Sequence, residues 1–131
     1  MSKPFNLRQY LINVLRRASY RFPERNKVLV AARIGRNQYV CTECPGKVYT
    51  RKEVSIDHIT PVRPVDRLTN DWTWDEFITN LFCDSSKLQV LCKPHHKEKT
   101  RMENILRRNY KKDLAENQKS CHNDKKDRKR K

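Results

Sequence analysis

The spacing of hydrophobic residues along the chain predicts helices near both ends and short strands between them. Residues 6–18 repeat apolar side chains every three or four positions, which is the period of a helix with one buried face. The stripe comprises Leu7, Tyr10, Leu11, Val14, Leu15 and Ala18. A second helix is expected to begin at Pro23, because proline suits the first helical position, and to end before Gly35.

Three short runs of strand-forming residues follow, at 38–41, 54–58 and 88–91. Between the last two, Thr73 and Glu76 form a capping-box pattern that predicts a helix over residues 73–82. A final helix is expected from about Pro94 to Tyr110. From Lys111 onward the chain is rich in Lys and Arg and nearly free of apolar residues, so we expect a disordered basic tail over 111–131.

Composition narrows the class of protein. The 131 residues carry 30 Lys and Arg against 15 Asp and Glu, a net charge of +15, which favours a polyanion such as nucleic acid as partner. The longest apolar run, 28–32, is too short for a membrane span. Arg8, Arg16 and Arg17 interrupt any apolar signal-peptide core. We therefore expect a cytoplasmic protein, with no membrane contact, whose cysteines are reduced.

Two short-spaced pairs predict a structural zinc site. Cys41-x-x-Cys44 and Cys92-x-x-His95 each place two zinc-binding side chains three residues apart, and together they supply four ligands. The alternative is a set of small buried thiols with a surface histidine. Cys83 lies beside an apolar helix end and is expected to pack in the core, and Cys121 receives no role.

A second set of residues suggests a divalent cation. Asp57-His58 stands at the end of an expected strand, and His96 follows the zinc ligand His95. Successive helix residues point about 100° apart, so His96 faces away from the zinc. Asp57 and His96 are therefore candidate ligands of Mg²⁺ or Mn²⁺. Neighbouring strand residues point to opposite faces, so Asp57 and His58 share a site only where the strand ends. The alternative is a surface pair with Asp57 capping a turn.

Residues 54–61 and 88–100 resemble the two motifs of the HNH endonucleases, and the likeness to small phage-type members extends over residues 22–104. The resemblance implies an α+β fold of the ββα-metal kind, in which a two-stranded antiparallel hairpin and a helix surround one catalytic metal, with flanking helices and a structural zinc. It implies that His58 is the general base, and that Asp57 and His96 hold Mg²⁺ or Mn²⁺. The implied substrate is a DNA phosphodiester bond.

Two positions depart from the family pattern. His95 stands where a cysteine is commoner, and Lys87 stands where the motif asparagine usually tethers the loop that bears the catalytic histidine. A lysine ammonium cannot accept a hydrogen bond. Asn80 is the nearest upstream asparagine, but it is expected on a helix surface. Lys87, Lys99 and Thr100 are candidate phosphate contacts, and a solvated helix face is the alternative for the last two.

The sequence thus predicts a helical segment at 1–36, a zinc-bearing nuclease core at 37–110 and the tail at 111–131. The expected function is a metal-dependent DNA endonuclease, either a nickase or a double-strand cutter, in a bacterial or phage-infected cell. The phage-type resemblance makes terminase or another DNA-processing protein a candidate partner. The alternatives are a zinc-stapled nucleic-acid-binding module without catalysis and a packaging accessory.

Overall fold

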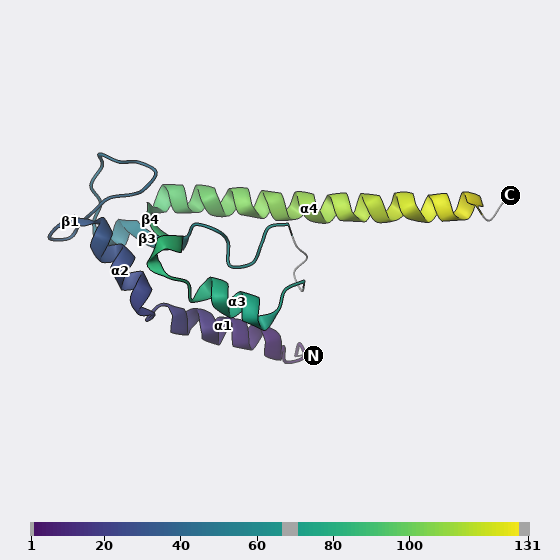
Figure 1. Cartoon of the computed structure of the whole chain (residues 1–131), viewed down its shortest axis with the longest axis horizontal. Coiled ribbons are helices and arrows are strands. Elements are labelled where there is room, and N and C mark those ends of the chain that lie inside the picture. Colours follow the sequence, from purple (N-terminus) through teal and green to yellow (C-terminus); the bar gives the residue numbers. More distant parts are fainter. Residues whose placement is uncertain (1, 67–70, 129–131) are drawn as a thin grey trace.

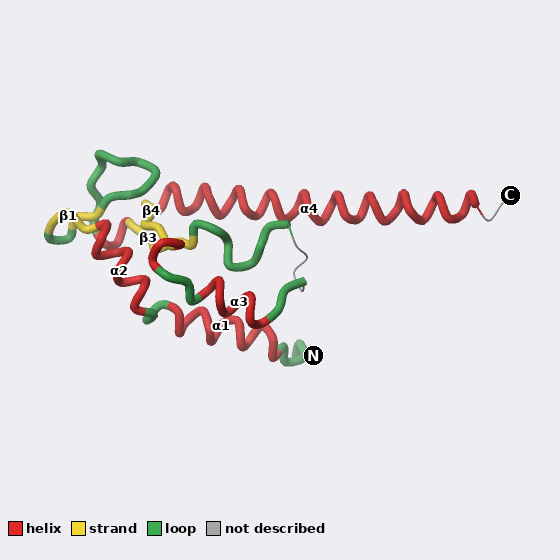
Figure 2. Tube along the Cα trace, viewed as in Figure 1, coloured by secondary structure: helices red, strands yellow, loops and turns green. Residues whose placement is uncertain are grey.

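The structure is a computed structural model that describes residues 2–66 and 71–128, with side chains described as far as residue 120. Over these ranges it combines four α-helices with two small antiparallel sheets (Figures 1 and 2). The elements in chain order are α1 (Leu7–Ser19), α2 (Pro23–Ala32), β1 (Arg33–Gly35), β2 (Gln38–Tyr39), η1 (Arg51–Glu53), β3 (Val54–His58), α3 (Trp74–Leu81), η2 (Ser85–Lys87), β4 (Leu88–Cys92) and α4 (Lys93–Arg128). The mixed helix and sheet content expected from the sequence is confirmed.

Strands β3 and β4 pair in register from Val54 opposite Cys92 to His58 opposite Leu88. Most of β4 is buried, and its buried positions are all apolar residues or cysteine; Gln89 is the one that is not buried. Helix α4 begins at Lys93, directly after β4 ends, and packs against both strands. The chain therefore runs from a two-stranded antiparallel pair straight into a long helix, and the expected strands at 54–58 and 88–91 are confirmed.

Two separate apolar clusters support this arrangement. The larger joins α1 to α3 through Ile12, Trp72, Phe77 and Leu81. Thr73 caps α3 by accepting a hydrogen bond from the Glu76 amide, as its sequence predicts. The smaller cluster consists of Cys41, Leu91 and Cys92 beside Tyr49. Because cysteines make up so much of it, its stability depends on what those thiols bind.

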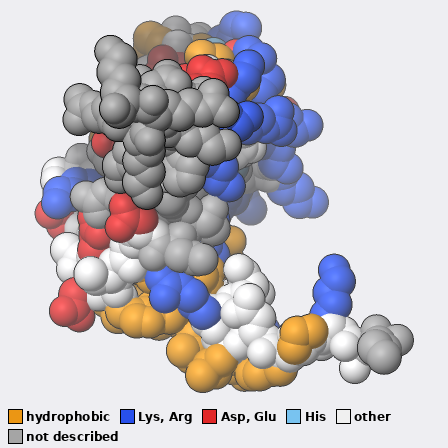
Figure 3. All heavy atoms as spheres, turned by 90° about the vertical axis from the view of Figure 1, so that its right-hand side faces the viewer, with side chains coloured by type: hydrophobic (Ala, Val, Ile, Leu, Met, Phe, Trp, Pro, Cys, Tyr) orange, Lys and Arg blue, Asp and Glu red, His pale blue; other side chains and the backbone are white. Residues whose placement is uncertain are grey.

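Helix α1 forms as expected, with Asn6 as its N-cap, but the face that it buries differs from the predicted stripe. Ile12 and Ser19 are buried, and Arg8 stacks on Trp72 at 4.0 Å from the ring centroid. The predicted apolar stripe is largely exposed: Leu7, Tyr10, Leu11 and Val14 are accessible to solvent. Apolar side chains accordingly gather at the lower end of the molecule in Figure 3. Periodicity located the helix, but the position of α3 decides which face is covered.

Helix α4 does not end near Tyr110 but continues to Arg128, and this corrects the expected disordered tail. Residues 111–128 contain no glycine or proline and many good helix formers, so nothing interrupts a helix begun at Lys93. In Figure 1 the C-terminal half of α4 extends beyond the other elements. Residues 129–131 and the side chain of Cys121 lie outside the described part. No helix within that part has both the length and the apolar character needed to span a membrane.

Candidate metal centre and acidic-histidine site

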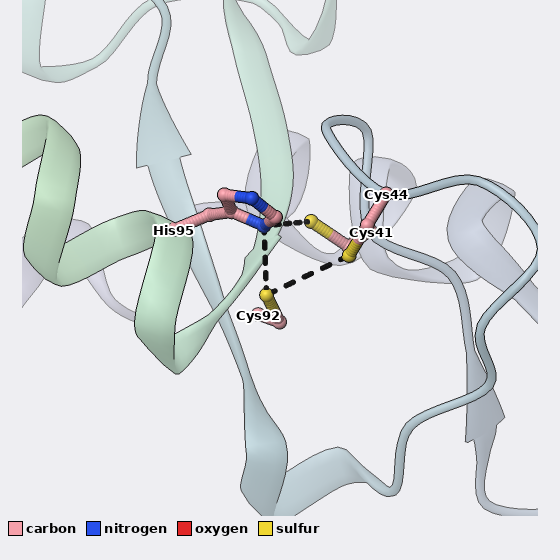
Figure 4. Close-up of side chains that lie close together, drawn as sticks. All are labelled: Cys41, Cys44, Cys92 and His95. Atoms are coloured by element: carbon pink, nitrogen blue, oxygen red, sulfur yellow. Dashed lines mark hydrogen bonds between the residues drawn. The ribbon is translucent and has the colours of Figure 1, made fainter.

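Four side chains converge where the loop after β2 meets the start of α4. Cys41 and Cys44 lie on that loop, Cys92 ends β4, and His95 lies in the first turn of α4 (Figure 4). Their ligand atoms all lie within 4.8 Å of one another. The sulfurs of Cys44 and Cys92 are 3.8 Å apart, and Nδ1 of His95 lies 3.7 Å from the Cys41 sulfur and 3.0 Å from the Cys92 sulfur. The two pairs predicted from spacing therefore form one cluster.

The geometry of this cluster fits a tetrahedral ion such as zinc. Two sulfur ligands bound to one tetrahedral zinc are about 3.8 Å apart. Burial of Cys41 disfavours its thiolate, but backbone amides of Cys92, Glu43 and Cys44 outweigh burial and lower its pKa to about 6. The Tyr49 hydroxyl lies 2.9 Å from the Cys44 sulfur and can donate to it once the thiol ionises. The donor set, its spacing and its outer partner thus suit a closed structural site.

A second group of side chains forms where the end of β3 meets the first turn of α4. Asp57 Oδ1 lies 3.7 Å from Nε2 of His96, which comes from the first turn of α4. The other oxygen of Asp57 accepts from the Gln89 amide at 3.3 Å. Asp57, His58 and His96 line one cavity of about 350 Å³. As expected from helix geometry, consecutive residues His95 and His96 serve two different clusters.

His58 ends β3 and is held from the side of α3. Its Nε2 lies 3.0 Å from the Leu81 carbonyl oxygen. Because a carbonyl oxygen only accepts, Nε2 carries the hydrogen, and Nδ1 of the neutral ring is then the basic atom. Burial lowers the pKa of His58 below its ordinary value, and the nearby positive charge of Arg25 lowers it further. The ring is therefore neutral near pH 7, as a proton acceptor requires.

The contacts of Lys99 differ from those expected from the sequence. Its ammonium group forms an ion pair with Asp57 at 2.9 Å and another with Glu103, and it donates to the His58 carbonyl oxygen at 2.9 Å. The side chain was expected as a phosphate contact, but its charge is directed at two carboxylates, Asp57 on β3 and Glu103 one turn further along α4. Thr100, the other helix candidate, is exposed, and its hydroxyl donates to the His96 carbonyl.

The loop after His58 is tethered by groups other than the expected motif asparagine. The Lys87 backbone carbonyl accepts from the Ile59 amide at 3.0 Å. Asn80 is half-buried, and its Nδ2 donates to the Val62 carbonyl at 3.2 Å, so its expected position on a helix surface is wrong. The Lys87 side chain lines a smaller cavity that also contains His58 and Asn80.

Cys83 is buried and lies outside the four-ligand cluster, as expected. Trp72 is also buried and packs with Phe77. No family model, no curated protein and no solved structure matches the chain.

Proposed function

We propose that this protein is a metal-dependent endonuclease that hydrolyses phosphodiester bonds of DNA. The single observation that carries the proposal is that Asp57 and His58, at the end of β3, share a cavity with His96 from the first turn of α4. The order of an antiparallel strand pair, a helix and a cysteine–histidine cluster at the base of that helix supports a ββα-metal arrangement. The net charge of +15 suits a polyanionic substrate.

In this proposal Asp57 and His96 hold one divalent ion, Mg²⁺ or Mn²⁺, and the zinc ion is structural. When bound, the divalent ion stabilises negative charge on the phosphate. His58 accepts the proton of a water molecule at Nδ1 as the water oxygen bonds to phosphorus and the bond to the 3′ oxygen breaks. The Leu81 carbonyl keeps the ring in the required tautomer. One such site cuts one strand in each encounter.

A supercoiled plasmid assay with Mg²⁺ or Mn²⁺ tests the proposal. We expect relaxed plasmid from the wild type, and a loss of about 10² to 10⁴ in rate for His58→Ala, the range for removal of a general base. Asp57→Asn should lose activity as well. Asp75→Asn, which makes the same change at an exposed position of α3, should keep it. Equal cleavage by the wild type and His58→Ala would refute the assigned base.

One observation favours a second candidate function, a zinc-stapled nucleic-acid-binding module. The Lys99 ammonium already pairs with Asp57, so a positive charge occupies the carboxylate without any metal. A protein in which this ion pair is permanent would bind DNA and leave it intact. Binding of Mn²⁺ to the zinc-loaded protein, measured by calorimetry, separates the candidates: binding that Asp57→Asn abolishes supports the nuclease, and its absence in the wild type supports the binding module.

A further inference from the structure

The cavity that holds Asp57, His58 and His96 also gathers four arginines. Arg16 comes from α1, Arg25 from α2, Arg63 from the segment after β3, and Arg107 from α4. These positions are far apart in the sequence, and the fold brings them to one cavity of about 350 Å³. Their convergence is visible only in three dimensions.

The four guanidinium groups are not neutralised within the protein. Arg25 donates to the Ile56 carbonyl, and Arg107 donates to the Arg63 carbonyl at 2.9 Å, so both are held by neutral acceptors. Among the described side chains none of the four has a carboxylate within ion-pair distance. The two carboxylates that line the cavity, Asp57 and Glu103, are both bound by Lys99. The cavity therefore contains unpaired positive charge.

This concentration of charge carries a cost that an anion would relieve. Burial lowers the pKa of Arg63, and the charges of Arg16 and Arg107 lower it further. Burial likewise lowers the pKa of Arg25, which is half-buried. An arginine fork also matches the oxygens of a phosphate group in a way that a lysine does not. Four like charges around one cavity thus indicate a site for phosphate groups.

We propose that Arg16, Arg25, Arg63 and Arg107 form a clamp for the backbone phosphates that flank the bond presented to His58. The inference rests on the proposed function, since it takes a nucleic-acid strand as the occupant. The cavity lining carries a net charge of +3, from four arginines and Lys99 against two carboxylates, and this exceeds the charge of one phosphodiester. Consecutive nucleotides supply one negative charge each. The clamp orients the strand by its backbone and reads no bases, so binding is independent of sequence.

Two pairs of neighbouring arginines provide matched controls for the test. Arg16 and Arg107 line the cavity, whereas their neighbours Arg17 and Arg108 do not. Each arginine is changed to glutamine in a separate variant, so that the two variants of a pair lose the same charge from the same helix. The affinity of the zinc-loaded protein for a fluorescent DNA duplex is measured over about 50 to 200 mM salt, without added divalent ion, so that no cleavage is needed.

We expect Arg16→Gln and Arg107→Gln each to weaken binding roughly tenfold and to reduce the salt slope by about one ion. Arg17→Gln and Arg108→Gln should change affinity much less. Arg16→Lys, which keeps the charge but loses the fork, should fall between Arg16→Gln and the wild type. Equal losses within each pair, with thermal melting unchanged, would overturn the clamp and leave a diffuse basic surface.

Two further readouts separate the alternatives. The first is the binding of inorganic pyrophosphate. If it binds the wild type as tightly as DNA does, and if this binding is lost in Arg16→Gln but not in Arg17→Gln, the cavity is a site for free polyphosphate and the nucleic-acid assignment is overturned. The plasmid assay is scored independently. Selective binding loss without plasmid cleavage by the wild type supports the clamp and contradicts the nuclease. Cleavage with equal losses within each pair supports the nuclease and contradicts the clamp.

Discussion

Replacing Cys92 by serine tests how far the fold depends on its metal centre. Cys92 is 1% exposed and lies between Cys44 and His95, so the change removes a central ligand of the four. Cys83→Ser is the matched control, because Cys83 is also buried, at 7% exposed, but lies outside the cluster. The two variants exchange the same sulfur for the same oxygen. Only one of them removes a member of the candidate metal cluster.

The expected magnitudes follow from the composition of the smaller core. Cys41, Leu91 and Cys92 are its buried members, so without an ion little apolar surface holds β4 to the loop after β2. Free zinc at a thousand times its dissociation constant stabilises the folded protein by about 4.1 kcal/mol, and a variant that no longer binds zinc loses this contribution. This is a large share of the roughly 5 to 15 kcal/mol that stabilises a typical domain. Placing a serine hydroxyl at the Cys83 position costs only about 1 to 3 kcal/mol.

The assay is thermal unfolding followed by circular dichroism, together with metal analysis of the purified protein. We expect one zinc per chain in the wild type and in Cys83→Ser, and much less in Cys92→Ser. At roughly 4 °C per kcal/mol, the melting temperature of Cys92→Ser should fall by about 15 °C, and that of Cys83→Ser by about 4 to 12 °C. Equal shifts in the two variants, or a wild type that melts unchanged after chelation, would refute the structural role of the metal.

Three other predictions follow from contacts described above. Asn80→Ala removes the hydrogen bond to the Val62 carbonyl and should lower stability by about 1 kcal/mol in a thermal melt, whereas Thr79→Ala, on the exposed face of the same helix, should not. Lys99→Ala frees the carboxylate that it pairs with, so Mn²⁺ should bind roughly tenfold more tightly by calorimetry; exposed Lys97→Ala is the control, and an equal gain there would contradict the ion-pair explanation. Deleting 115–131 should leave the melting temperature unchanged but weaken DNA binding in gel shifts, and a destabilised truncation would show that the helix end supports the core.

Local patterns predicted much of the fold because each depends on a few neighbouring residues. The cysteine and histidine spacing identified the four clustered side chains. Runs of strand-forming residues located β3 and β4, and the capping box located α3. Other features depend on segments far apart in the sequence. The buried face of α1 is set by where α3 lies, and the Asn80 tether requires the loop at Val62 to approach α3. The four-arginine cavity likewise needs the complete fold.

The expected end of the last helix was wrong for a different reason. A charged, apolar-poor segment lacks the hydrophobic surface that a packed domain needs, and this suggested disorder. A helix requires only that its own backbone groups be paired, and Lys, Arg, Glu, Ala and Gln all accept that conformation readily. Once Lys93 begins the helix on a packed base, extension costs little at each added residue.

Because α4 is long, a small change of angle at its first turn displaces its far end by a large distance. At 36 residues the helix is about 54 Å long, and one of the four clustered side chains, His95, lies at its beginning. A tilt of about 10° at that end would displace the far end by roughly 9 Å, nearly three base-pair steps of duplex DNA. An ion held by His95 would therefore set the direction of the whole helix. A small change in the coordination of that ion would then produce a large change in where the charged residues of the far half of α4 meet a duplex.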